Sequence, residues 1–136
     1  MPTQKRKRGT LLRTRASKRA LKEDPTALIA KADKRVLELL TELGSDANIP
    51  YHVSFWMYFP KEEQAYKVAA ELGKQKFEVE VSPPLDGYDK WLCLAFRQLV
   101  PRFATIDRLR KRLTELTTRY GGEFDGWEME VKNNAR

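Results

Sequence analysis

The residues that could do chemistry in this 136-residue chain are mainly glutamates that alternate with apolar residues. Glu78 and Glu80 form one such pair, and Glu128 and Glu130 form another. Two carboxylates can act as general acid and base when they share a substrate. We predict these pairs to lie at opposite edges of one sheet, too far apart to do so. The single histidine, His52, has no Cys, Asp or Glu at ligand spacing, and the chain has no P-loop and no G-x-G-x-x-G. We therefore predict no catalytic site, no metal and no cofactor.

The positive charge of the chain is concentrated at its N-terminus. The net charge is +7 at pH 7. Residues 1–24 hold nine basic and two acidic residues and so carry all of this excess, whereas residues 25–136 hold 17 of each sign. Like charges without regular apolar spacing disfavour a compact state. We predict a basic flexible tail over residues 1–24 and a single domain over residues 25–136.

Helix and strand signals follow one another along this predicted domain. Asp24-Pro25 is a helix start, and Gly44 a helix end, of a leading helix over residues 25–43. Alternating apolar residues predict strands near 53–59, 77–81, 91–96 and 127–131. Helical spacing follows Pro60 up to Gly73, and follows Pro101 up to Gly121-Gly122.

The order after the leading helix is therefore βαββαβ. This order predicts an α+β, ferredoxin-like fold with a four-stranded antiparallel sheet in the order 4-1-3-2, two helices on one face and one extra N-terminal helix in front. The short length, the single Cys93 and the absence of a long apolar run predict a cytoplasmic protein.

The other face of this sheet has the composition of a binding surface. We expect aromatic residues in its middle and carboxylates along both margins, from the residues His52, Ser54, Trp56, Tyr58, Glu78, Glu80, Glu128 and Glu130. Guanidinium groups pair with carboxylates and stack on aromatic rings, whereas these carboxylates would repel an RNA backbone. The hypothesis is that Trp56 and Tyr58, with the four glutamates, bind a basic, flexible protein segment.

Two alternatives remain open at this point. The leading helix 25–43 can fold over these aromatics, in which case its exposed side, or the cluster Arg108, Arg110, Lys111 and Arg112, becomes the interface. The tail can contact RNA phosphates nonspecifically. The residues predicted for this contact are Lys5, Arg6, Lys7, Arg8, Arg13 and Arg15. A nuclear address from Lys5 to Arg8, an organelle transit peptide from Thr10 to Leu21 and a merely solubilising tail are further interpretations of this region.

The run Tyr120-Gly121-Gly122-Glu123-Phe124-Asp125-Gly126-Trp127-Glu128 resembles the RraB family, the B-type regulators of ribonuclease E activity, whose hallmark is an aromatic residue followed by Asp-Gly-Trp. The stretch from Glu38-Leu39-Leu40 to Gly44-Ser45-Asp46 and the stretch Phe77-Glu78-Val79 are similar too, so the resemblance covers roughly residues 30–131. It implies a ferredoxin-like domain that binds ribonuclease E and lowers its activity by contact, without catalysis. It also adds Asp125 and Trp127 to the predicted partner-binding residues. The basic tail departs from the acidic character of the family.

The predicted function is thus a non-catalytic, protein-binding inhibitor of an RNA-degrading endonuclease of the ribonuclease E type. The alternative is an RNA- or ribosome-binding module that uses the basic tail. A salt titration separates these two functions, because RNA binding weakens steeply with salt.

Overall fold

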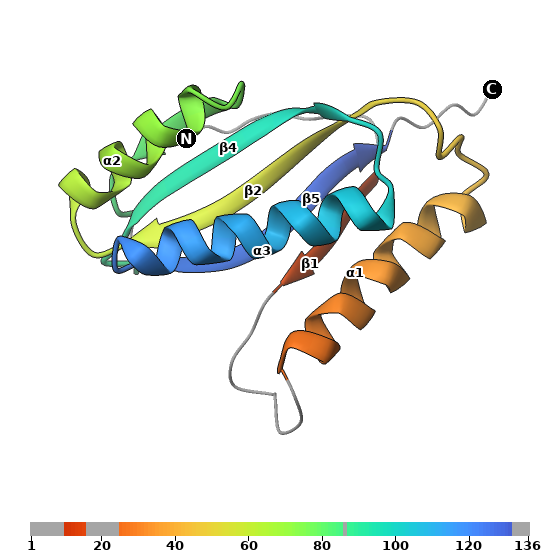
Figure 1. The fold of residues 1–136 in the computed structure, drawn as a ribbon, viewed down its shortest axis with the longest axis horizontal. Helices are drawn as coiled ribbons and strands as arrows, with labels where there is room; N and C mark the ends of the chain where they lie inside the picture. The colour runs from red at the N-terminus through yellow and green to blue at the C-terminus, as the bar shows by residue number, and fades with distance from the viewer. Residues whose placement is uncertain (1–9, 16–24, 86, 132–136) are drawn as a thin grey trace.

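The computed structural model describes residues 10–15, 25–85 and 87–131. Within these residues the chain forms three helices and one antiparallel sheet, which confirms the predicted α+β class. The elements are, in chain order (Figure 1), β1 Thr10–Arg15, α1 Pro25–Glu42, β2 Tyr51–Phe59, α2 Glu62–Gly73, β3 Glu78–Ser82, β4 Trp91–Leu99, α3 Phe103–Arg119 and β5 Glu123–Val131. In the described part of the chain, no helix is long and apolar enough to cross a membrane.

The sheet has five strands in the order β1-β5-β2-β4-β3. The four predicted strands are neighbours in the order β5-β2-β4-β3, and β1 is an additional strand beyond β5. It pairs with β5 from Thr10 opposite Val131 to Arg15 opposite Gly126. The prediction of a flexible tail is therefore wrong for residues 10–15, and the rest of residues 1–24 lies outside the described residues. The edge of β5 offers unpaired backbone groups with which residues 10–15 form hydrogen bonds, and Leu12 becomes buried. These two gains outweigh the repulsion between the positive charges of this segment.

The leading helix ends as the sequence predicts. Gly44 has a φ of 78°, and its N–H donates to the carbonyl of Thr41 at 2.9 Å, while the Ser45 N–H donates to the carbonyl of Leu40 at 3.1 Å. This pair of bonds closes the last turn, and glycine takes the left-handed conformation at little cost. α1 contacts β1 and α3 and lies on the same side of the sheet as α2 and α3 (Figure 1). The alternative in which this helix covers Trp56 and Tyr58 is therefore wrong.

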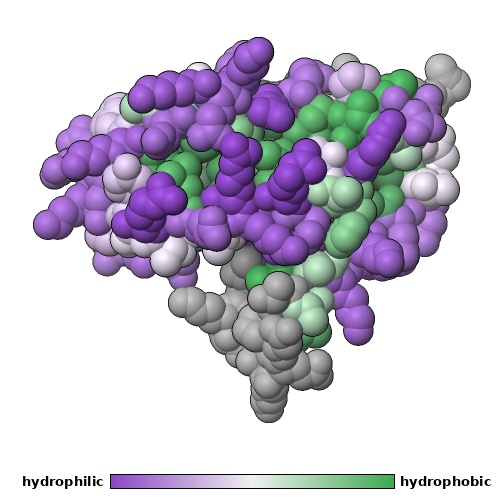
Figure 2. All heavy atoms as spheres, viewed as in Figure 1, coloured by the Kyte–Doolittle hydropathy of each residue, from purple (hydrophilic) through white to green (hydrophobic). Residues whose placement is uncertain are grey.

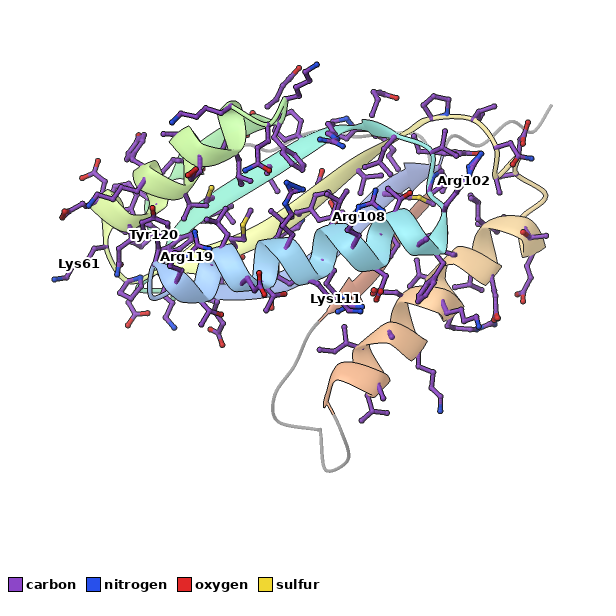
Figure 3. All side chains as sticks on the ribbon, viewed as in Figure 1. Lys61, Arg102, Arg108, Lys111, Arg119 and Tyr120 are labelled. Atoms are coloured by element: carbon purple, nitrogen blue, oxygen red, sulfur yellow. The ribbon has the colours of Figure 1, made fainter. Side chains whose placement is uncertain are left out.

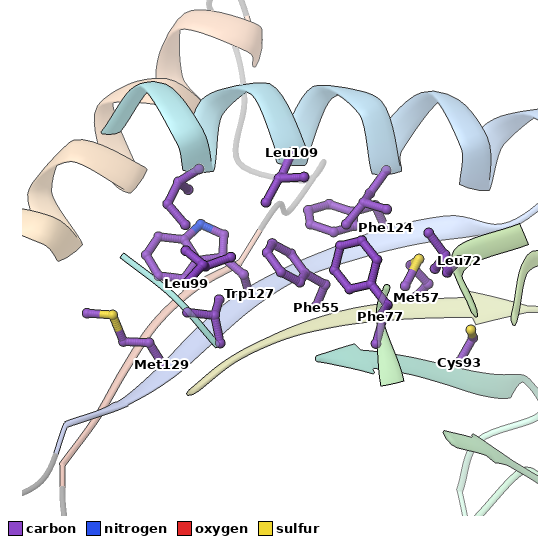
Figure 4. Packing of buried hydrophobic residues seen from close by; sticks show 14 of the residues in the cluster. Phe55, Met57, Leu72, Phe77, Cys93, Leu99, Leu109, Phe124, Trp127 and Met129 are labelled. Atoms are coloured by element: carbon purple, nitrogen blue, oxygen red, sulfur yellow. The ribbon is translucent and has the colours of Figure 1, made fainter. Parts of the chain in front are cut away.

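The core lies between the sheet and the three helices. Residues at alternate positions of β2 point into it, and Phe55, Met57 and Phe59 are fully buried. They pack with Leu72, Phe77, Leu109, Phe124 and Trp127 (Figure 4). Burying an aliphatic or aromatic side chain of this size contributes about 1.5–3 kcal/mol. Side chains alternate between the two faces of a strand. The intervening residues of β2, which are His52, Ser54, Trp56 and Tyr58, therefore face the opposite side of the sheet.

Candidate functional site

The sheet face opposite the helices has an apolar centre, and we call this side of the sheet the open face. Trp56 of β2 stands opposite Leu94 of β4, and Tyr58 stands opposite Leu92. The rings of His52 and Phe96 lie 5.2 Å apart between centroids. Each of these side chains is partly exposed. No described helix packs on the open face, so it presents partly exposed aromatic and aliphatic surface, which is typical of an interaction site.

Carboxylates flank this apolar centre on both sides. Glu80 of β3 stands opposite Leu94, and Glu78 stands opposite Phe96, and both glutamates are exposed. On the other side the register places Glu128 opposite Ser54, and Glu130 opposite His52. Of the described positions that face this side in β2 to β5, none is a lysine or arginine. In β2 to β5 the open face therefore has carboxylates around an apolar strip, and the register places Arg13 and Arg15 of β1 beside Glu128 and Gly126.

Glu128 and Glu130 do not line an edge of the sheet, contrary to the prediction. The strand β1 lies beyond β5, so β5 is an interior strand. Glu128 is only 5% exposed and stands between Ser54 of β2 and Arg13 of β1 in the register. The exposed rim of carboxylates is thus the β3 side, where Glu78 and Glu80 lie.

A hollow of about 290 Å³ lies at one end of the open face. It is lined by Tyr58, Tyr88, Asp89, Lys90, Glu123 and Asp125. The rings of Tyr58 and Tyr88 meet edge to face at 6.1 Å, and the Lys90 ammonium lies 3.7 Å from a Glu123 carboxylate oxygen. Three carboxylates, one ammonium and two aromatic rings make a site suited to a cationic side chain.

The Asp125-Gly126-Trp127 run shapes this region through its backbone. The register shifts by a bulge between Trp56 and Met57 of β2, where Gly126 stands opposite Trp56. Gly126 has a φ of 130°, which a residue with a Cβ rarely adopts. The bulge keeps Asp125 on the open face beside Tyr58 and turns Trp127 to the other side. The prediction that Trp127 belongs to the partner-binding surface is therefore wrong, because its side chain is 1% exposed in the core.

Trp127 instead takes part in a buried polar contact that the sequence interpretation missed. Its indole Nε1 donates to Oδ1 of Asp33 at 2.9 Å, and Arg110 Nε donates to Oδ2 of the same carboxylate at 2.7 Å. Arg110 also pairs with Asp107. Asp33 is fully buried. The sequence does indicate that Asp33 is buried, because this residue lies in the apolar stripe of its helix, between Ile29 and Val36.

The basic cluster on α3 is split by this contact. Arg110 is 5% exposed and faces the core, whereas Arg108, Lys111 and Arg112 are exposed on the outer side of the helix. Lys111 Nζ lies 2.9 Å from Asp107 Oδ2. Figure 2 shows hydrophilic side chains over this helical side, and Figure 3 places Arg108 and Lys111 along α3. This surface has the composition of an ordinary solvated helix face.

The remaining candidates for chemistry are not brought together. Within residues 10–15, 25–85 and 87–131, no three His, Cys, Asp or Glu side chains group as a metal site would require. Cys93 is fully buried, and burial raises the pKa of its thiol to about 12. A thiol with this pKa holds its proton at neutral pH and is a poor nucleophile. Of the predicted RNA-binding residues, Arg13 and Arg15 lie in β1, and Lys5 to Arg8 lie outside the described residues.

The comparisons with known proteins point in one direction. A family model described as regulator of ribonuclease activity B, RraB, matches residues 30–129. The matched span contains β2, β3, β4 and all of the Asp125-Gly126-Trp127 run, and it leaves out β1. No curated protein matches the chain.

Proposed function

The chain belongs to the RraB family of regulators of ribonuclease activity, and from this premise we propose that it inhibits an RNA-degrading endonuclease of the ribonuclease E type by binding it. It acts as a non-catalytic, cytoplasmic protein and needs no cofactor. The observation that carries the proposal is the open face, an apolar strip bordered by carboxylates, with no lysine or arginine among the described positions of β2 to β5 that face this side.

The chemistry of the open face fits a basic, flexible polypeptide segment of the ribonuclease. Arginine binds carboxylates through two N–H groups and stacks its planar guanidinium on aromatic rings. An extended arginine-rich segment lying across β2 and β4 would meet Trp56 and Leu94 in the middle and Glu80 at the side. The proposed partner-binding residues are Trp56, Tyr58, Glu78, Glu80, Asp125, Glu128 and Glu130.

The proposed inhibition follows from occupation of a basic segment of the ribonuclease by this chain. Basic segments of a ribonuclease attract RNA through its phosphates. A protein that binds such a segment competes with RNA for the same cations, so it lowers cleavage without altering the catalytic centre. For the fold, we propose that the unit from β2 to β5 is of the ferredoxin-like kind, supported by the strand order β5-β2-β4-β3, with α1 and β1 added to it.

Charge reversal on the β3 side tests this function. The variant E78K/E80K reverses the two exposed carboxylates, and E62K/E63K makes the same charge change on exposed positions of α2, on the helical side. We expect E78K/E80K to weaken binding of a ribonuclease E-type endonuclease by about tenfold or more, measured by calorimetric titration. Inhibition of RNA cleavage should weaken in parallel.

The matched control decides the interpretation. E62K/E63K should bind and inhibit like the unmodified chain, because salt-screened charges on the far side act weakly over that distance. Equal weakening by both variants would mean that only net charge matters. Unchanged binding by E78K/E80K, with an unchanged circular dichroism spectrum, would rule out the open face as the interface.

A further inference from the structure

The chain carries a basic segment of its own beside the acidic open face. The strand β1 begins at Thr10, which pairs with Val131, and the next residue, Leu11, pairs with Glu130. The strand β1 therefore begins next to the end of β5 that carries Glu130, and residues 1–9, which we call the N-terminal segment, precede it in the sequence. This segment contains four cations in succession, from Lys5 to Arg8, and no acidic residue.

The N-terminal segment is long enough to reach the middle of the open face. An extended chain advances by at most about 3.3–3.6 Å per residue, so Lys5, five residues before Thr10, lies within about 17 Å of it. Neighbouring strands are about 4.8 Å apart, and Trp56 lies two strands across from β1 and about five residues along the strands from the level of Thr10, which places it about 20 Å from Thr10. The cations from Lys5 to Arg8 can thus reach the carboxylates of β5, and the farthest of them, Lys5, approaches Trp56.

Charge complementarity selects this segment as the occupant. The open face has six carboxylates at described positions, from the residues Glu78, Glu80, Glu123, Asp125, Glu128 and Glu130. Its described basic residues are fewer, because Lys90 lies beside Glu123 in the hollow and the register places Arg13 and Arg15 of β1 beside Glu128 and Gly126. The helical side has exposed carboxylates such as Glu62 and Glu63, but Lys67, Arg108 and Lys111 are exposed on the same side and offset them. Opposite charges at short range attract, and aromatic rings such as Trp56 add cation–π attraction for arginine.

We propose that the N-terminal segment binds the open face of its own molecule through Lys5 to Arg8, as an internal competitor of the basic segment of the ribonuclease. The competition, though not the internal contact, rests on the function proposed above. A short flexible tether gives an effective concentration on the order of millimolar. An external ligand must then displace the segment, so the chain binds strongly only to a partner segment that outcompetes four tethered cations.

A spin label tests the internal contact on the full-length chain. A nitroxide on T3C is selective because the only natural thiol, Cys93, is buried with a pKa of about 12. We expect it to broaden the NMR signals of Trp56, Leu94 and Glu80 strongly, and those of Arg112 on α3 weakly. In roughly 0.5 M salt the broadening should fall, because a Debye length of a few ångströms screens the attraction. Broadening spread equally over both sides of the molecule would overturn the proposal.

A competition experiment tests the consequence. The probe is a fluorescent peptide of about eight arginines, and the variant is K5S/R6S/K7S/R8S, with K67S/K74S/R108S/R112S as a control that loses the same charge from exposed positions of the helical side. We expect the first variant to bind the peptide about three- to tenfold more tightly than the unmodified chain, and the control to gain far less.

The outcomes separate the two proposals. Equal peptide affinity of K5S/R6S/K7S/R8S and the unmodified chain overturns internal competition, while the function proposed above stands if E78K/E80K still weakens ribonuclease binding. Conversely, two results support the internal competitor: broadening of the open-face signals by the label on T3C, and tighter peptide binding by K5S/R6S/K7S/R8S. Both can hold even if E78K/E80K leaves ribonuclease binding intact, which would overturn only the proposed ribonuclease interface.

Discussion

The indole Nε1 of Trp127 donates a hydrogen bond of 2.9 Å to Asp33, a residue 94 positions earlier in the chain. This bond ties β5 to α1, and Arg110 ties the same carboxylate to α3. The tryptophan of the Asp-Gly-Trp run is thus a structural anchor beneath the sheet. Its two preceding residues act on the other side, where Gly126 stands opposite Trp56 and Asp125 lines the hollow beside Tyr58.

Removal of the Asp33 carboxylate should destabilise the fold strongly. In D33A the guanidinium of Arg110 stays buried without its main partner, which typically costs about 3–5 kcal/mol of unfolding free energy. W127F removes one donor to Asp33 and leaves a small cavity in the core, which together should cost about 1–3 kcal/mol. Urea unfolding measures both. The control E38A, at an exposed position of α1 paired with Arg35, should cost less than about 1 kcal/mol. Similar losses for D33A and E38A would contradict this account of the buried pair.

Two glycines should respond oppositely to alanine. A Cβ on Gly122 would overlap the ring of Phe59 and the carbonyl oxygen of Tyr58, so G122A should lower the unfolding free energy by about 1–3 kcal/mol. A Cβ on Gly73, the last residue of α2, meets nothing within 4 Å, and G73A should raise stability by about 0.4–1 kcal/mol. Thermal and urea unfolding of both variants checks this. An unchanged unfolding free energy of G122A would show that the turn before β5 can shift to accommodate the added Cβ at little cost.

The pH dependence of stability should carry the signature of Cys93. Its pKa is raised from 9.0 to about 12 by burial, so in the window between these values the unfolded chain loses the thiol proton while the folded chain keeps it. Stability from this group is intact below pH 9 and is lost as pH rises, by about 1.4 kcal/mol per pH unit. Between pH 8 and pH 10 the unmodified chain should therefore lose about 1.4 kcal/mol more than C93A in urea unfolding. Parallel losses would show that Cys93 does not control this window.

RNA should bind this chain through the N-terminal segment and not through the open face. Carboxylates beside Trp56 repel a phosphate backbone, whereas Lys5 to Arg8 attract it. We expect any affinity for a labelled single-stranded RNA to fall steeply with salt and to vanish in K5S/R6S/K7S/R8S. RNA binding that survives in this variant and is strengthened by E78K/E80K would instead indicate base stacking on the open face.

The sequence predicts the elements well because their signals are local. Period-two alternation from Val53 to Phe59 and the glycine at position 44 each reflect one strand or one helix end, and the structure has them within a few residues. The apolar and acidic composition of the open face follows from the same alternation. These features need no knowledge of distant contacts.

The features that the sequence interpretation missed depend on distant partners. β1 has the charge pattern of a tail, and only the free edge of β5 makes it a strand. Asp33 and Arg110 are ordinary helical charges until the fold brings them together under Trp127. The family resemblance assigns Trp127 to the partner-binding surface, although its alternation with Glu128 and Glu130 indicates the core side. The bulge beside Gly126 instead explains why Asp125 lies on the open face together with Glu128.

Photo-crosslinking tests most directly whether the open face binds the ribonuclease. A photoreactive amino acid replaces Glu80, at the exposed rim of the open face, or Arg112, at an exposed position of α3 on the opposite side. With a ribonuclease E-type endonuclease added, we expect crosslinks from position 80, mapping to an arginine-rich segment of the enzyme, and none from position 112. Crosslinks from position 112 alone would show that the open face is not the interface.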